Sequence, residues 1–316
     1  MADPALPTGR LRAGVIGVGY LGAFHAEKYA ALPGVDLVGV ADISAARAQE
    51  IAARHHTQAV SDYRDLIGKV DCISLAVPTP LHAAIARELL AAGIDVLVEK
   101  PLTDTVADGR ELVELAEKHG RILQVGHLER FNPAIRALAD VLTQPRFIEC
   151  DRLAQFGERG TDVDVILDLM IHDLDVILSL VNAEVQHIEA VGVPVLTNST
   201  DIANVRLRFS NGCIANITAS RVALKKERKL RIFQADTYVS VDYGEKHVRV
   251  CRRIIENDMP TIAVDERKLD SGDALLDEIK HFVHAVRTRQ RPLVDGRTAL
   301  RALELADRIR ANLETE

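Results

Sequence analysis

The chain has 316 residues, of which 47% are hydrophobic and 27% are charged, and its formal net charge is −7. This length favours two domains, and the composition is typical of a globular protein without long disordered segments. The acidic balance excludes a surface for nucleic acid or anionic membranes as the main function and favours a small-molecule substrate.

The first 127 residues alternate short apolar runs with amphipathic stretches, as βαβ units around a parallel sheet do. The stretches between the runs have the periodicity of helices. We therefore predict an α/β domain, residues 1–127, with a Rossmann doubly wound parallel sheet. The predicted strands are 13–17, 36–42, 72–77, 96–99 and 122–125.

After residue 127 the pattern changes to one long helix, 163–181, followed by strand-like runs with hairpin signals. Asn211 and Gly212 separate two of these runs, which is a strong signal of a tight β-hairpin. Residues 128–316 are therefore predicted to form an α+β domain on a largely antiparallel sheet, for substrate binding and oligomerisation. Its predicted strands are 184–193, 202–209, 213–222, 229–234, 238–243 and 247–252, and its closing helices are 274–288 and 298–312.

A Gly-x-Gly-x-x-Gly sequence, residues 17–22, lies between the first predicted strand and the first helix. Its glycines permit a tight turn and a close approach of a pyrophosphate, and the helix N-terminus attracts the phosphates. In this context the sequence predicts a dinucleotide site. The loop residues of that site are Gly17, Gly19, Tyr20, Leu21 and Gly22.

Asp42 ends the second predicted strand, 20 residues after Gly22. A carboxylate at this place binds the ribose hydroxyls of the adenosine and repels a 2′-phosphate. Ile43 and Ser44 offer no adjacent cation, although Arg47 lies one turn later. The predicted cofactor is therefore NAD rather than NADP.

Two further segments follow predicted strands at the edge of the sheet where open α/β sheets bind ligands. Val77 ends the third strand and is followed by Pro78 and Thr79, and Glu99 ends the fourth strand and is followed by Lys100. The proline at position 101 favours an extended conformation before it, so Lys100 is expected to point into the cofactor cleft as a catalytic candidate. His82 has two open interpretations, a cofactor contact or an ordinary residue in the first turn of a helix.

With these motifs the chain resembles the glucose–fructose oxidoreductase and inositol dehydrogenase (Gfo/Idh/MocA) family over nearly its whole length. The resemblance extends to Asp168 and His172, which are similar to the family's Asp-x-x-x-His pair. It implies an NAD-dependent dehydrogenase that acts on a secondary alcohol of a sugar, with Glu99 at the cofactor and with Lys100, Asp168 and His172 as catalytic and substrate-binding residues. It also implies a homodimer or homotetramer that associates through the C-terminal sheet.

The predicted helix 163–181 carries polar residues along one face. That face by itself is typical of a solvated surface, but with the family motifs we interpret it as the wall of the active site. Asp173 falls on the opposite, apolar face, where a carboxylate needs a partner that the sequence does not identify. The residues within the polar arc are Asp164, Asp168, His172, Asp175 and Ser179.

The segment Gly-His-Leu-Glu-Arg-Phe-Asn-Pro, residues 126–133, resembles a subgroup of the family, the UDP-N-acetylglucosamine 3-dehydrogenases and related uronate 3-dehydrogenases, and so does segment 159–164. The resemblance implies a UDP-N-acetylhexosamine substrate, a place in lipid A biosynthesis, and substrate contacts by Arg130 and Asn132. A basic run follows later in the chain and either neutralises a substrate diphosphate or forms the solvated side of a strand. Its residues are Lys225, Lys226, Arg228, Lys229 and Arg231.

The implied reaction is reversible hydride transfer between the 3-hydroxyl of the sugar and the nicotinamide. In this reaction His172 is the base, Asp168 orients His172, and Lys100 stabilises the developing alkoxide. Which of Lys100 and His172 accepts the proton stays an open alternative. The alternatives are a cyclitol or free-sugar dehydrogenase, a family glycosidase that uses NAD transiently, and an NAD(P)-binding regulator without catalysis.

The sequence lacks recognisable targeting segments and cysteine spacings typical of metal sites. The first twelve residues lack the apolar segment of a signal peptide, and no run of about 18 apolar residues follows, so we expect a cytoplasmic protein. The cysteines have no Cys-x-x-Cys spacing and are expected to be reduced thiols, with no metal site. They are Cys72, Cys150, Cys213 and Cys251.

Overall fold

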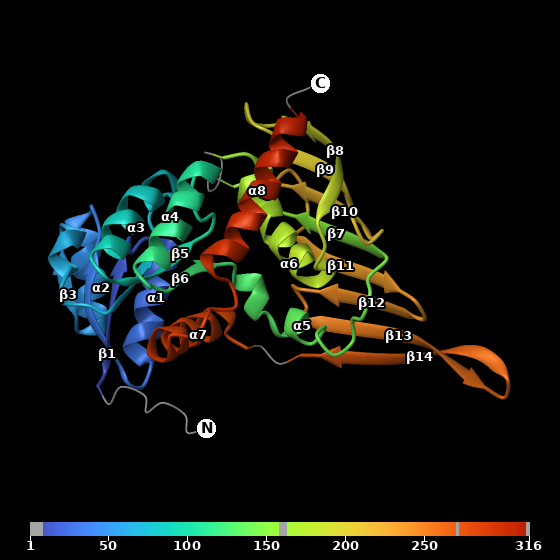
Figure 1. Ribbon diagram of the computed structural model, residues 1–316, viewed down its shortest axis with the longest axis horizontal. Helices are drawn as coiled ribbons and strands as arrows, with labels where there is room; N and C mark the ends of the chain where they lie inside the picture. Colours follow the sequence, from blue (N-terminus) through green and yellow to red (C-terminus); the bar gives the residue numbers. More distant parts are fainter. Residues whose placement is uncertain (1–8, 158–162, 270–271, 314–316) are drawn as a thin grey trace. The chain divides into compact units, whose positions relative to one another are not determined.

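The computed structural model describes residues 9–157, 163–269 and 272–313. They form two compact units, drawn as one ribbon in Figure 1. The first unit extends to Leu128 and includes Asp273–Leu300, and the second contains Glu129–Gly272 and the chain from Arg301 onward. The chain therefore leaves the first unit near residue 128 and returns to it after residue 272.

The first unit is built on a parallel sheet with the strand order β3-β2-β1-β4-β5-β6. The order reverses between β1 and β4, which is the doubly wound arrangement of a Rossmann fold. Its strands are β1 (Leu11–Ile16), β2 (Val35–Ala41), β3 (Gln58–Val60), β4 (Cys72–Leu75), β5 (Asp95–Glu99) and β6 (Leu123–Gly126). The predicted fold class is confirmed, and β3 is an additional edge strand of three residues.

The helices of the first unit follow the strands in alternation. They are α1 (Tyr20–Ala31), α2 (Ala45–His55), α3 (His82–Ala91), α4 (Val106–Lys118) and α7 (Ala274–Thr288), with single turns η1 (Tyr63–Leu66) and η2 (Thr79–Leu81). Ser44 and Thr105 begin α2 and α4, because each side chain accepts a hydrogen bond from a backbone N–H of the first turn. Thr79 is the first residue of η2, which leads into α3.

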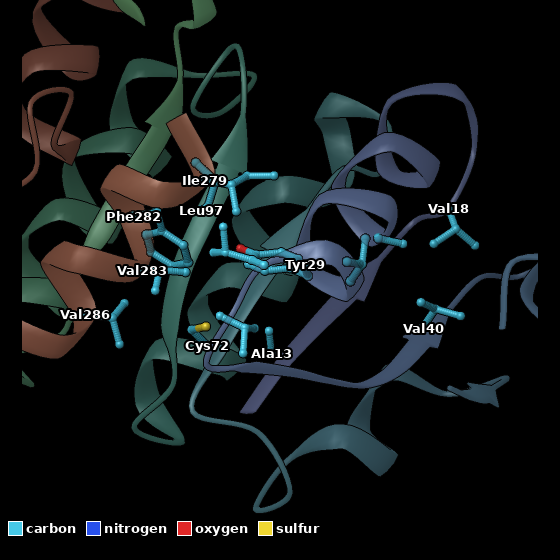
Figure 2. Packing of buried hydrophobic residues seen from close by; sticks show 14 of the residues in the cluster. Ala13, Val18, Tyr29, Val40, Cys72, Leu97, Ile279, Phe282, Val283 and Val286 are labelled. Carbon is cyan, nitrogen blue, oxygen red and sulfur yellow. The ribbon is translucent and has the colours of Figure 1, made fainter. Parts of the chain in front are cut away.

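The helix α7 belongs to the core of the first unit, although the sequence places residues 274–288 in the second domain. Phe282 and Ile279 of α7 are fully buried in one apolar cluster with Tyr29 of α1 and Leu97 of β5 (Figure 2). Burying an aromatic or large aliphatic side chain contributes roughly 1.5–3 kcal/mol. This apolar face therefore holds α7 on the cofactor unit, a long-range contact that sequence order does not reveal.

The second unit is built on a sheet with the strand order β14-β13-β12-β11-β7-β10-β9-β8. Only β7 and β10 pair in parallel among the described strands, so the prediction of a largely antiparallel sheet is confirmed. The strands are β7 (Phe147–Leu153), β8 (Val185–Val193), β9 (Ile202–Phe209), β10 (Ile214–Ser220), β11 (Glu227–Gln234), β12 (Thr237–Asp242), β13 (His247–Glu256) and β14 (Met259–Lys268). The predicted hairpin joins β9 to β10, with Gly212 at a φ of 83°.

The helical elements of the second unit include two segments in direct succession, η4 (Ile166–Met170) and α6 (Ile171–Val181). The others are η3 (Leu128–Phe131) at the start of the unit, α5 (Pro133–Arg136), and α8 (Gly296–Leu313), whose first residues lie in the first unit. The predicted helix 163–181 therefore begins three residues later than expected. Its first turn is a π-helix, and the remainder is α-helical.

One face of the second sheet carries a row of apolar side chains across neighbouring strands. Phe147 of β7 contacts Phe233 of β11, whose ring stacks on Tyr238 of β12 with centroids 4.9 Å apart. The register continues this row through Cys251 of β13 to Val264 of β14. The hairpin β13–β14 extends beyond the other strands of the sheet (Figure 1). We call these five residues the apolar row.

Candidate active site

The glycine loop has the geometry that a dinucleotide requires. A Cβ on Gly17, whose φ is 79°, would lie 2.6 Å from the carbonyl oxygen of Ala76, and a Cβ on Gly22 would overlap the carbonyl oxygen of Gly17. Above Gly19 there is open space, and no side chain of the described residues caps the N-terminus of α1. The first backbone N–H groups of α1 are thus available to a phosphate group. Tyr20 in the first turn is exposed.

Asp42 follows β2 and is fixed against this loop. Its Oδ2 accepts a hydrogen bond from the Val18 N–H, and its Oδ1 accepts one from the Ser44 N–H, both at 2.9 Å. Arg47 donates to the carbonyl oxygens of Val18 and Gly19 and pairs with Glu50 at 2.7 Å. The carboxylate is therefore pre-positioned beside the glycine loop, and the nearby guanidinium braces that loop. These residues fit an adenine dinucleotide.

His82 begins α3 and lies buried between two loops. One ring nitrogen is 2.9 Å from the carbonyl oxygen of Val77, and the other is 2.9 Å from that of Pro101. Burial lowers the pKa of His82. This placement favours the interpretation of His82 as a brace between the loops after β4 and β5. Pro78 lies on the first of these loops and Thr79 begins η2, and both are at least partly exposed.

Glu99 and Lys100 lie at the carboxyl end of β5, as predicted. The Glu99 carboxylate contacts His25 Nε2 at 2.9 Å and accepts a hydrogen bond from the Lys100 N–H at 3.3 Å. A Cβ at Gly126 would lie 2.9 Å from Glu99 Oε2, so the glycine leaves room for the carboxylate. Lys100 is half-buried, and its peptide bond to the following proline is cis. His25 was not foreseen; the available signal was a polar residue on the buried side of α1.

Asp168 and His172 lie in the second unit, on either side of the junction between η4 and α6. Both side chains are half-buried. The spacing i, i+4 assumed a regular α-helix, whereas Asp168 belongs to the π-helical turn. Such turns occur frequently at functional sites. The Asp164 carboxylate accepts hydrogen bonds from the backbone of that turn and pairs with Arg310 at 2.7 Å.

The predicted polar arc is only partly exposed. Ser179 is exposed, but Asp175 is 2% exposed and pairs with Arg130 at 3.5 Å. Asn132 accepts a hydrogen bond from the Ala134 N–H and so caps α5. Arg130 and Asn132, two of the residues predicted to bind substrate, thus both make contacts within the second unit.

Asp173 has a partner that the sequence did not identify. Arg152 of β7 binds it through two hydrogen bonds of 2.7 and 2.8 Å, and both side chains are almost fully buried. Arg152 also contacts Glu129 at 3.2 Å. Burial lowers the pKa of Arg152, but the charge of Asp173 outweighs it, so the net pKa lies well above its ordinary value. This ion cluster holds α6 on the sheet.

Two residues of the basic run have the placement that its second interpretation predicts. Lys229 and Arg231 lie on β11 and alternate with buried apolar residues. Arg231 pairs with Glu149 and Asp151 at 3.2 and 3.3 Å, and Lys229 pairs with Glu227 at 3.2 Å. These pairs are typical of the solvated side of a strand. Of the motif 159–164, residues 159–162 lie outside the described part of the chain.

The sheet order, the open glycine loop and the carboxylate after β2 together define a dinucleotide-binding Rossmann domain. Residues 11–127 match the family model "Oxidoreductase family, NAD-binding Rossmann fold", and residues 139–238 match the GFO/IDH/MocA C-terminal domain. The chain belongs to the GFO/IDH/MocA family. It is a dehydrogenase whose cofactor is NAD.

The similarity to individual relatives extends over most of the chain. UDP-N-acetylglucosamine 3-dehydrogenase from Acidithiobacillus ferrooxidans is 38% identical over 307 residues, 96% of this chain and 97% of that protein. A solved structure of that enzyme has a TM-score of 0.91 and covers 96% of this chain and 98% of its own. Inositol 2-dehydrogenase from Rubrobacter xylanophilus is 29% identical over 68% of this chain and 66% of its own.

More distant structures share the fold. A levoglucosan dehydrogenase in complex with NADH is 19% identical and has a TM-score of 0.85, over 96% of this chain and 97% of its own.

No helix among the described residues combines the length and apolar character needed to cross a membrane.

Proposed function

We propose that this protein oxidises the 3-hydroxyl of a UDP-linked N-acetylhexosamine, with NAD as the hydride acceptor. The observation that carries this proposal is the 38% identity with a UDP-N-acetylglucosamine 3-dehydrogenase across 96% of the chain. The presence of Lys100, Asp168 and His172 supports catalysis rather than a purely regulatory role.

Each catalytic residue has a distinct proposed role. His172 takes the proton of the substrate hydroxyl while the hydride of the C–H bond at the same carbon passes to NAD. Asp168 orients His172 and stabilises its charged form. Lys100 donates a hydrogen bond to the substrate oxygen and so stabilises the developing alkoxide. Glu99 holds the strand end from which Lys100 projects.

A substrate screen tests the proposal directly. The purified protein is incubated with NAD and, separately, with UDP-N-acetylglucosamine, UDP-N-acetylgalactosamine, a UDP-linked uronate, free N-acetylglucosamine and myo-inositol. We expect continuous NADH formation with a UDP-sugar and a product that has lost two hydrogens. Turnover with myo-inositol and with none of the UDP-sugars would replace the proposal by the cyclitol dehydrogenase that the similarity to inositol 2-dehydrogenases makes the second candidate.

We propose that the enzyme prefers NAD over NADP because of Asp42. Replacing Asp42 with Ala removes a carboxylate that would bind the ribose hydroxyls and repel a 2′-phosphate. A hydrogen bond to a charged group contributes about 1.5–3 kcal/mol, so NADH should bind roughly ten- to a hundredfold more weakly. Fluorescence titration with NADH and NADPH measures both constants. Unchanged affinity for both NADH and NADPH would show that the adenosine is not bound at the end of β2.

We also propose that two copies of the chain associate through the face of the second sheet that carries the apolar row. Val264 of this row and Ile262 beside it are more than half exposed on the projecting hairpin. An exposed apolar surface of this kind is typical of a protein interface.

Light scattering at micromolar concentration is expected to give a dimer or tetramer. An Ile262→Arg variant should shift the measured mass toward that of the monomer, because its charge would be buried in the interface. The matched control is Leu293→Arg, which changes an exposed leucine of the first unit. A monomeric wild-type protein would contradict the proposal.

A further inference from the structure

A chain of buried polar side chains lies behind Lys100 in the first unit. Glu99 Oε1 is 2.9 Å from His25 Nε2, and His25 Nδ1 is 3.0 Å from Ser74 Oγ. Ser74 Oγ is in turn 2.9 Å from the hydroxyl of Tyr29. His25, Ser74 and Tyr29 are fully buried, so this chain ends in the core and not at the solvent. Its effect is therefore to hold the Glu99 carboxylate in place.

All of these hydrogen bonds can run toward Glu99. If Tyr29 donates to Ser74, and Ser74 donates to His25, then the remaining ring N–H donates to Glu99 and every group is satisfied. Burial raises the pKa of Glu99, but the hydrogen bond with His25 and the charge of Lys100 outweigh it, so the net pKa lies below its ordinary value. Glu99 is consequently the negative charge of this cluster.

A second carboxyl group, that of Glu278 on α7, is buried in the same core. Its side chain is 0% exposed, and neither oxygen has a hydrogen-bond partner among the described residues. The neighbouring residue Ile279 packs in the apolar cluster with Tyr29 (Figure 2). Gln124 donates a hydrogen bond to the backbone oxygen of Glu278 at 3.3 Å. An ionised carboxylate without partners is very costly in such surroundings. The geometry therefore requires a neutral group.

We propose that Glu278 carries a proton in the resting enzyme, and that this neutral acid, together with the chain from His25 to Tyr29, positions Lys100 by keeping the negative charge of the cluster on Glu99. The role of Lys100 rests on the proposed function, whereas the proton on Glu278 does not. Glu278 is thus a positioning residue. Its ionisation would add a second negative charge that repels the charge on Glu99, and so would disturb the contact between Glu99 and Lys100.

The ionisable groups around Glu278 come from several elements. Glu99 lies at the end of β5, Tyr29 on α1, and Cys72 on β4 beside Tyr29. On α7 itself, His281 follows three residues after Glu278, and its ring is 3.5 Å from the side-chain oxygen of Gln124. Burial raises the pKa of Tyr29 and of the Cys72 thiol, so both stay neutral at ordinary pH. Burial, and then the charge of Glu99, raises the pKa of Glu278 well above its ordinary value of 4.5.

The proton on Glu278 has a thermodynamic signature that needs no substrate. Since the pKa of Glu278 is higher in the folded than in the unfolded chain, its stabilisation is complete below about pH 4.5 and is lost as the pH rises toward the folded pKa. Glu278→Gln is neutral at every pH and lacks this dependence. The unfolding constant of the wild type, relative to the variant, should rise about tenfold per pH unit in this window.

Urea unfolding of the full chain between about pH 5 and pH 8, followed by circular dichroism, measures this ratio. Infrared spectra at neutral pH should show a protonated carboxyl band that Glu278→Gln removes and the exposed control Glu114→Gln retains. A ratio that does not change with pH, or a band that persists in Glu278→Gln, would show that Glu278 is ionised and would overturn the proposal. Neither measurement depends on which sugar is the substrate.

The positioning role is tested by pH profiles of kcat with a sugar that turns over. The wild type should lose activity at alkaline pH as Glu278 ionises, and Glu278→Gln should not. His25→Leu should shift the acidic limb to higher pH because Glu99 loses its donor, and His25→Gln, which keeps an N–H, should restore it. Profiles that are unchanged in all three variants would refute the positioning role, whereas absence of turnover with every sugar would refute the proposed function.

Discussion

Lys100→Met and His172→Ala proteins are expected to bind NAD almost as the wild type does and to lose turnover. The glycine loop and Asp42 are proposed to hold the cofactor, whereas Lys100 and His172 are proposed to act on the substrate oxygen. A positioned base contributes about 10²–10⁴-fold to the rate. The loss should appear mainly in kcat, because an interaction made mostly in the transition state leaves ground-state affinity largely unchanged.

The double variant is expected to lose less than the product of the two single losses. Under the proposed mechanism both residues serve the same developing alkoxide, so once one is absent the other has less to assist. NADH fluorescence gives the binding constants, and turnover is measured with the best UDP-sugar. His187→Ala, which changes an exposed histidine of β8, is the matched control. A His172→Ala protein with near wild-type kcat between about pH 6 and pH 9 would leave Lys100 as the base.

Replacing Arg152 with Met is expected to destabilise the second unit by about 3–5 kcal/mol. The substitution leaves Asp173 as an unpaired negative charge in a buried place, and Glu129 loses a partner as well. Urea unfolding monitored by circular dichroism measures the change. The size of the effect distinguishes this pair from the many ion pairs at the surface, which contribute about 0–1 kcal/mol each.

Two variants control this measurement. Arg253→Met removes an exposed pair with Asp236 and should cost little. Arg152→Met combined with Asp173→Leu should be less destabilised than Arg152→Met alone, since the unpaired carboxylate is gone. Equal stability of Arg152→Met and Arg253→Met would mean that the buried pair contributes no more than a surface pair.

The features that the sequence predicts well are those set by local chemistry. The fingerprint Gly17, Gly19 and Gly22, with Asp42 after the second strand, depends on a single turn and its flanking strands, and the structure has that turn as expected. The bounds of α7, 274–288, also agree, because its apolar face follows helical periodicity.

The features that the sequence missed depend on contacts between distant segments. The strand β7 carries a buried arginine, Arg152, on its inward side, so its apolar alternation is interrupted where Asp173 needs a partner. The strand β14 is mostly exposed and therefore has little apolar pattern to detect. The cluster of His25, Glu99 and Glu278 joins three elements far apart in the chain, and only the folded core brings them together.

The return of residues 273–300 to the first unit has a consequence for biosynthesis. A nascent chain of about 130 residues already contains the cofactor loop, but it lacks Phe282 and Ile279, which cover Tyr29 in the finished core. The core of the cofactor unit can therefore close only after α7 has been synthesised. A chimera joined once near residue 128 would combine mismatched halves of this core. Exchanging the unit between relatives requires junctions near residues 128, 272 and 300, so that α7 travels with its own sheet.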